Sequence, residues 1–297
     1  MLANFVFLCY NEKKRTQAKR PSSERLLFMF PLMNFHTHTT YCDGANTPKE
    51  MVEEAIARGF KALGFSGHGY TFFDLRYCMT MEATEKYLED IFRLKQEYKG
   101  DIEIYAGVET DLYSDLDTSA FDFVIGSLHY LKKNGEYFSI DGSPELFKEL
   151  VKAYEGDLYT LAEDYFSLMG EMMDRTRANI IGHFDLITKY NEKGEYFNEE
   201  NPRYRAAAEG ALDRLLQTDC IFEINTGAIA RGYRTLPYPS AAQIGKIAAA
   251  GNRFVLTSDC HQKEKLDFFF EEATHLPFWK EVERTLITDT SFIKKKT

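Results

Sequence analysis

The chain has 297 residues, of which 44% are hydrophobic and 28% charged, and its 36 Lys and Arg against 46 Asp and Glu give a net charge of −10 at pH 7. This length allows one large domain or two ordinary ones, each with a sizeable core. Nucleic acid and anionic membranes repel a negative chain, so neither is expected as a general partner. The five cysteines are an odd number without a CxxC pair, which favours a reducing, cytoplasmic location over a disulfide framework.

The first 32 residues differ in composition from the rest. The apolar run 5–10 precedes its basic residues, Lys13, Lys14 and Arg15, which is the reverse of a signal peptide. No stretch approaches the ~18 apolar residues that cross a bilayer. Residues 11–25 are polar and basic. We therefore expect residues 1–32 to be a flexible leader, or to reflect a mis-set translation start before Met33, and residues 33–297 to form the functional domain.

From Asn34 onward, short apolar runs alternate with amphipathic segments. The apolar runs predict strands around Phe35 and at Ala62–Phe65, 102–108, 121–125, 179–181, 221–224 and 254–256. Helical patterns lie between them at 48–58, 82–98, 144–175, 203–217 and 240–250. The clearest begins at a capping box, Thr47 with Glu50, and stops at Gly59. This alternation predicts a parallel sheet, and seven repeats favour one closed α/β barrel over two stacked domains.

Six of the seven histidines and three carboxylates fall at or just after the ends of these strands. They are His36, His38, Asp43, His68, Glu109, His129, His183, Asp259 and His261. In a parallel barrel the carboxyl ends of the strands converge on one mouth. Any one of these residues alone is explained equally well by ordinary structure. Together they would be costly to bury without a counter-charge, which a divalent cation supplies. Imidazole and carboxylate without thiolate suit Zn²⁺, Mn²⁺ or Fe²⁺.

The ordered motifs around these residues resemble the polymerase and histidinol phosphatase (PHP) superfamily. They are HTH (36–38), GH (67–68), GVE (107–109), GSLH (126–129), GHFD (182–185) and SDCH (258–261). The resemblance runs from Met33 onward. Because no polymerase or exonuclease module accompanies it, the chain is most similar to the monofunctional histidinol-phosphatase branch. This resemblance implies a single domain with a distorted (β/α)7 TIM-like barrel and a trinuclear metal site.

The same resemblance implies which residues bind each of three divalent ions (Zn, Mn or Fe), because the ligands follow from the positions of the motifs. The first ion would take His36, His38, Glu109 and Asp259, the second would share Glu109 with His129 and His183, and the third would take Asp43, His68 and His261.

The resemblance further implies hydrolysis of L-histidinol phosphate to L-histidinol and phosphate, a step of histidine biosynthesis. We expect direct attack by a metal-bridged hydroxide without a phosphoenzyme. The expected catalytic residues are Asp259, Glu109 and His261, with Asp259 the best candidate for handling a proton. For phosphate, the loop after the sixth strand offers the forked guanidinium of Arg231, with Arg234 as second choice, and Lys189 is a further candidate substrate-binding residue.

Two alternatives stay open. One is a phosphoesterase of the same superfamily that acts on another small phosphate or on phosphotyrosine. The other is a degenerate PHP module that binds metal or a partner without catalysis, against which the complete ligand set argues. In either enzymatic case the partner is a small phosphate ester, and the chain is expected to be a monomer or a small homo-oligomer.

Overall fold

A computed structural model describes residues 30–293 of the chain. The chain divides after Phe30, and the unit Pro31–Thr297 contains the helices and strands described below. Most of the predicted leader falls on residues 1–29, outside the described residues. Within 30–293, none of the helices combines the length and the apolar composition needed to cross a membrane.

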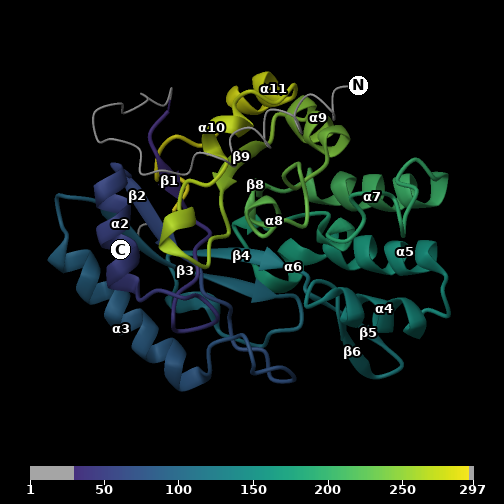
Figure 1. The fold of residues 1–297 in the computed structure, drawn as a ribbon, viewed down its shortest axis with the longest axis horizontal. Helices are drawn as coiled ribbons and strands as arrows, with labels where there is room; N and C mark the ends of the chain where they lie inside the picture. Colours follow the sequence, from purple (N-terminus) through teal and green to yellow (C-terminus); the bar gives the residue numbers. More distant parts are fainter. Residues whose placement is uncertain (1–29, 294–297) are drawn as a thin grey trace. The chain divides into compact units, whose positions relative to one another are not determined.

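A parallel sheet of seven strands forms the centre of the described residues (Figure 1). In sheet order the strands are β1 (Met33–Asn34), β2 (Ala62–Phe65), β3 (Glu103–Asp111), β4 (Phe123–Ser127), β7 (Ile180–Ile181), β8 (Ile221–Asn225) and β9 (Arg253–Thr257). Just beyond β1 and β9, the amide of His38 donates to the carbonyl of Cys260 at 2.9 Å, and the amide of Cys260 donates to the carbonyl of His36 at 3.3 Å. These bonds join the two outer strands, so the sheet closes into the predicted barrel at its carboxyl end.

All seven strands lie within a few residues of their predicted positions, and β2 matches its prediction at both ends. The apolar runs identify them because strands of a parallel barrel are covered on both faces. β1 and β7 have only two residues each, which makes the barrel irregular.

Helices connect the strands in the expected alternation. They are α2 (Pro48–Arg58), α3 (Met81–Glu97), α4 (Pro144–Ala153), α5 (Leu158–Met169), α6 (Met172–Thr176), α7 (Pro202–Leu215), α8 (Gly227–Ala230), α9 (Ala241–Ala249), α10 (Phe270–Ala273) and α11 (Trp279–Glu283). The predicted capping box of α2 is present, since the Thr47 side chain accepts from the Glu50 amide and Glu50 accepts from the Thr47 amide. The single helix predicted over 144–175 is wrong, because the chain turns at Gly156, where φ is 81°, and again near Gly170.

The sequence prediction also missed a hairpin between β4 and α4. Its strands are β5 (Tyr130–Lys133) and β6 (Glu136–Ser139), which pair antiparallel. Asn134 and Gly135 link them with φ of 52° and 89°, as a two-residue hairpin turn of this type requires. The hairpin follows His129 directly, so it extends the rim of the mouth.

Two apolar clusters hold the barrel together. One lies between the sheet and helices α2 and α3, and the other lies among the strands and includes Phe35, Phe123 and Ile125. Phe123 packs edge-on against Phe35 with ring centroids 5.6 Å apart. Gly107 on β3 pairs with Phe123 on β4 and has no room for a side chain, because an added Cβ would lie 2.2 Å from the Phe123 ring. The strands can approach at this level only because residue 107 is glycine.

We predict that Gly107→Ala lowers the free energy of unfolding by about 1–3 kcal/mol, the usual cost of overpacking a core. Gly210→Ala is the matched control, since Gly210 lies in α7 with open space around it and alanine favours a helix by up to about 1 kcal/mol. Urea unfolding of both variants measures the difference. Equal stability of Gly107→Ala and wild type would contradict this account of the core.

Candidate metal centre

A buried carboxylate, Glu109, lies at the centre of the barrel mouth. It comes from the carboxyl half of β3, and the Ser127 hydroxyl donates to its Oε1 at 2.7 Å. Five imidazoles from different loops surround its two oxygens. On the Oε2 side are His36 Nε2 at 3.1 Å, His68 Nδ1 at 3.0 Å and His38 Nε2 at 3.5 Å, and on the Oε1 side are His183 Nε2 at 2.9 Å and His129 Nε2 at 3.2 Å.

Asp259 faces the same point from the loop after β9. Its Oδ1 lies 3.2 Å from His38 Nε2 and 3.6 Å from His36 Nε2. Its backbone has a φ of 45°, a conformation that non-glycine residues adopt at a cost. Gly227 gives the carboxylate its space, because a Cβ there would lie 2.8 Å from Asp259 Oδ2. The loop conformation therefore serves to aim this carboxylate into the mouth.

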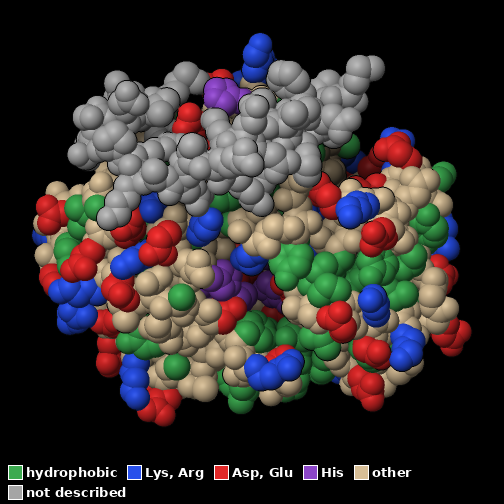
Figure 2. Space-filling model, in the orientation of Figure 1, with side chains coloured by type: hydrophobic (Ala, Val, Ile, Leu, Met, Phe, Trp, Pro, Cys, Tyr) green, Lys and Arg blue, Asp and Glu red, His purple; other side chains and the backbone are tan. Residues whose placement is uncertain are grey.

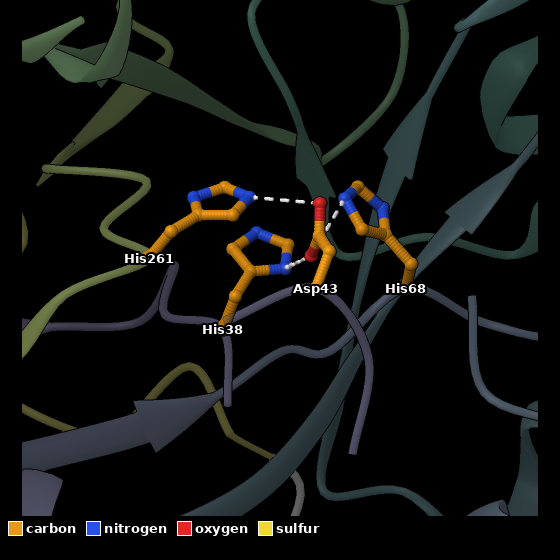
Figure 3. Close-up of side chains that lie close together, drawn as sticks. All are labelled: His38, Asp43, His68 and His261. Atoms are coloured by element: carbon orange, nitrogen blue, oxygen red, sulfur yellow. Dashed lines mark ion pairs between the residues drawn. The ribbon is translucent and has the colours of Figure 1, made fainter. Parts of the chain in front are cut away.

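Asp43 gathers a second group nearer the rim (Figure 3). Its Oδ1 lies 3.7 Å from both His38 Nδ1 and His68 Nε2, and its Oδ2 lies 3.3 Å from His261 Nε2. The amide of Ala45 donates to the carbonyl of His261 at 2.8 Å, which ties the loops of Asp43 and His261 together. The structure thus brings all nine predicted ligands to one mouth, and Figure 2 shows histidine side chains at the bottom of a hollow in this face.

The charges of the cluster are strongly coupled. Burial alone would raise the pKa of Glu109, but His36, His68 and His129 hold that pKa well below its usual value. Burial, together with His261 and His68, lowers the pKa of His38 to about 3. Glu109 is therefore ionised and His38 neutral at pH 7, which are the forms that bind metal.

The buried atoms of this cluster fit a divalent metal. His36 Nε2, His38 Nε2 and Glu109 Oε2 make no hydrogen bond within the described residues, although all three are buried. Buried polar atoms without partners are rare in proteins and need a reason. Three overlapping residue groups have donor atoms close enough to share an ion: His38, Asp43, His68 and His261; His36, His38 and Glu109; and His68, Glu109 and His129. Imidazole and carboxylate donors suit Zn²⁺, Mn²⁺ or Fe²⁺.

Glu223 on β8 is a site residue that the sequence prediction missed. Its Oε1 lies 2.5 Å from His36 Nδ1 and accepts from Thr257 Oγ1 at 2.6 Å, while its Oε2 accepts from the His183 amide at 2.8 Å and from Asn225 Nδ2 at 3.0 Å. A carboxylate on one ring nitrogen directs the other nitrogen towards a metal. The only sequence signal was an acidic residue inside an otherwise apolar strand.

Asp111 supports a second candidate ligand through its backbone amide. Its Oδ2 accepts from the His129 amide at 2.8 Å and lies 3.5 Å from His129 Nδ1. Glu223 and Asp111 thereby fix ligands on opposite sides of Glu109.

The candidate phosphate-binding residues differ in where they lie. Arg231, just after α8, donates from Nη2 to Asp259 Oδ2 at 2.9 Å and from Nη1 to the Asp259 carbonyl at 3.1 Å, and its side chain is 33% exposed. Arg234 is nearly buried, donates to the backbone and hydroxyl of Thr188, and lies over the ring of Tyr238. Of the two arginines, Arg231 is the one that contacts the candidate metal ligands.

Lys189, the third candidate, contacts Asp141. Its Nζ donates to the backbone carbonyl of Asp141 at 2.6 Å and lies 3.4 Å from the Asp141 carboxylate.

Two cysteines lie beside candidate ligands in the sequence. Cys260 packs in the apolar cluster beside α2 and α3, and Cys42 packs against that cluster with its Sγ 3.6 Å from His38 Nδ1.

We predict that Glu223→Gln weakens metal binding by about 10- to 100-fold, the usual effect of losing a carboxylate behind a histidine ligand. An amide nitrogen cannot accept the bonds that both carboxylate oxygens now accept. Competition with a chromophoric chelator measures the affinity, and Glu85→Gln on the exposed side of α3 is the matched control. Unchanged affinity in Glu223→Gln would show that Glu223 does not orient His36.

Comparisons with known proteins identify relatives of this chain. A probable histidinol-phosphatase from Deinococcus radiodurans is 28% identical over 256 residues, which cover 82% of this chain and 92% of that protein. The histidinol-phosphatase of Bacillus subtilis is 26% identical over 259 residues, which cover 80% of this chain and 96% of that protein.

A solved structure has the same fold. It is the histidinol phosphate phosphatase of Lactococcus lactis, complexed with zinc, L-histidinol and phosphate, with a TM-score of 0.64 and 21% identity over 89% of this chain and 98% of its own. The family model of the PHP domain matches residues 34–227, which is more than half of the chain. The chain therefore belongs to the PHP domain family.

Proposed function

We propose that the chain is a histidinol-phosphatase, which hydrolyses L-histidinol phosphate to L-histidinol and phosphate with the help of divalent metal ions. The observation that carries this proposal is the position of Glu109, a buried carboxylate with one oxygen towards His36 and His68 and the other towards His129 and His183. Such an arrangement suits a carboxylate shared between two cations. The relatives named histidinol-phosphatase support the choice of substrate.

The proposed metal content is three ions, which would be Zn²⁺, Mn²⁺ or Fe²⁺. It is supported by the three overlapping donor groups, which share His38, His68 and Glu109. When bound, such ions lower the pKa of a coordinated water and neutralise the charge of a phosphate. The grouping differs from the motif-based assignment at three points. His38 joins the Asp43 group, His68 takes the place of His183 beside Glu109 and His129, and Asp259 is outside the group of His36 and His38.

Arg231 is the proposed phosphate-binding side chain. Its guanidinium already points into the mouth, with Nη1 3.3 Å from His261 Nδ1. One third of the side chain is exposed, so N–H groups that do not bond Asp259 can reach a phosphate oxygen. Its positive charge also offsets Asp259, which would otherwise repel the substrate.

Three residues are the proposed catalytic groups. Glu109 holds the centre of the site as an anion. Burial would raise the pKa of Asp259, but Arg231 and His36 keep that pKa well below its usual value, so the group is ionised at pH 7. Its Oδ1, 3.2 Å from His38 Nε2, is the proposed atom for handling a proton. His261 has the most exposed side chain of the six imidazoles, 26%, so a bound substrate reaches this ring first.

We propose that the protein acts in the cytoplasm on a small phosphate ester and does not bind nucleic acid. We further propose that it is a monomer or a small homo-oligomer. Support comes from the net charge of −10 and from the four described cysteines, which form no disulfides within residues 30–293.

Phosphate release from a panel of substrates tests the proposal. We expect the metal-loaded protein to hydrolyse L-histidinol phosphate with a kcat/KM at least about tenfold above that for sugar, nucleotide and tyrosyl phosphates. The His36→Ala variant, purified in parallel, should lose about a thousandfold or more and so exclude a contaminating phosphatase. A flat substrate profile, or a preference for tyrosyl phosphate, would contradict the proposed function.

A further inference from the structure

A carboxylate outside the candidate metal ligands lies at the rim of the same mouth. Asp141 follows the β5–β6 hairpin, and the amide of the residue before it, Ile140, donates to the carbonyl of His129 at 2.8 Å. This bond ties Ile140 to the candidate ligand His129 and so holds the next residue, Asp141, near the metal centre. Neither the metal groups nor the proposed catalytic residues include Asp141.

The backbone at Asp141 is held by two side chains from the segment that follows β7. Lys189 Nζ donates to its carbonyl at 2.6 Å, and the Tyr190 hydroxyl donates to the same oxygen at 3.0 Å. Lys189 is nearly buried, and its ammonium lies 4.8 Å from the centre of the Tyr233 ring. Lys189 therefore supports this loop, and its pairing with one oxygen of the Asp141 carboxylate makes it a poor phosphate ligand.

The Asp141 carboxylate itself stays available. Its side chain is 27% exposed, and within the described residues its Oδ1 makes no hydrogen bond, while Oδ2 lies 3.4 Å from Lys189 Nζ. Burial would raise the pKa of Asp141, but Lys189, His129 and His183 lower it, so the group is ionised at pH 7.

We propose that Asp141 is a specificity-determining residue that binds the α-ammonium group of the substrate. This inference rests on the proposed function, because histidinol phosphate carries a primary amine that is protonated at neutral pH, next to the phosphate-bearing carbon. Arg231 and the proposed metal ions attract the phosphate end, and the free oxygen of Asp141, near His129 and Lys189, offers the complementary anion for the amine. A charge-assisted bond at this point selects amino alcohol phosphates over phosphates that lack an amine.

Two substrates test the inference: L-histidinol phosphate and its desamino analogue, 3-(imidazol-4-yl)propyl phosphate. We expect wild type to prefer the amine-bearing substrate, and the ratio of the two kcat/KM values to fall by about 10- to 100-fold in Asp141→Asn. The loss should appear mainly as a higher KM for histidinol phosphate, because the ammonium is bound in the ground state and the transition state alike. Asp141→Glu, which keeps the charge, should recover part of the ratio.

Asp101→Asn is the matched control, since this exposed residue precedes β3 at the opposite end of the barrel and its loss changes the net charge equally. Metal content and the circular dichroism melt are measured for every variant. A purely structural role would lower kcat/KM for both substrates together and leave their ratio unchanged, which would overturn the inference.

The wild-type protein supplies a test that needs no variant. If Asp141→Asn does not fold, a wild-type ratio near one between the two substrates overturns the inference, and a ratio of about ten or more supports it. Failure of wild type to hydrolyse either substrate would instead overturn the proposed function, and the inference with it.

Discussion

The structure depends on how the charge of one buried carboxylate is compensated. Glu109 is almost fully buried and is surrounded by five imidazoles, so its desolvation is offset only if positive charge gathers around it. Protons on the histidines provide part of that charge, and divalent cations provide it more completely. The unpartnered nitrogens of His36 and His38 point to the place where such a cation fits.

The barrel makes this arrangement possible by bringing distant segments together. Glu109 comes from β3, whereas His36 and Asp259 come from the segments just after β1 and β9, which are joined by the bonds between residues 36–38 and Cys260. Behind this layer, Glu223 holds His36 and the backbone of His183 at once. A single carboxylate on β8 therefore couples two candidate ligands on opposite sides of Glu109.

The strands, and the cluster of side chains that the structure brings together, could be predicted from the sequence because both follow simple rules. Strands covered on both faces are apolar runs, and ligands follow the strand ends. The rest depends on three-dimensional detail. Glu223 could not be assigned, because a carboxylate within a strand faces a ligand only in the correct register. Arg231 and Arg234 have the same chemistry, and only the path of the loop after α8 turns one to Asp259 and the other to Thr188. The hairpin at Asn134 and Gly135 was missed, although its turn signal was present.

The central claim is that the two oxygens of Glu109 serve two different metal ions. Anomalous diffraction from crystals grown with Mn²⁺ or Zn²⁺ tests it most directly, because the ions are located individually. The account predicts at least two anomalous peaks, one beside Oε2 among His36, His38 and Asp259, and one beside Oε1 near His129 and His183. A single peak, or peaks that leave one oxygen of Glu109 without an ion, would contradict it.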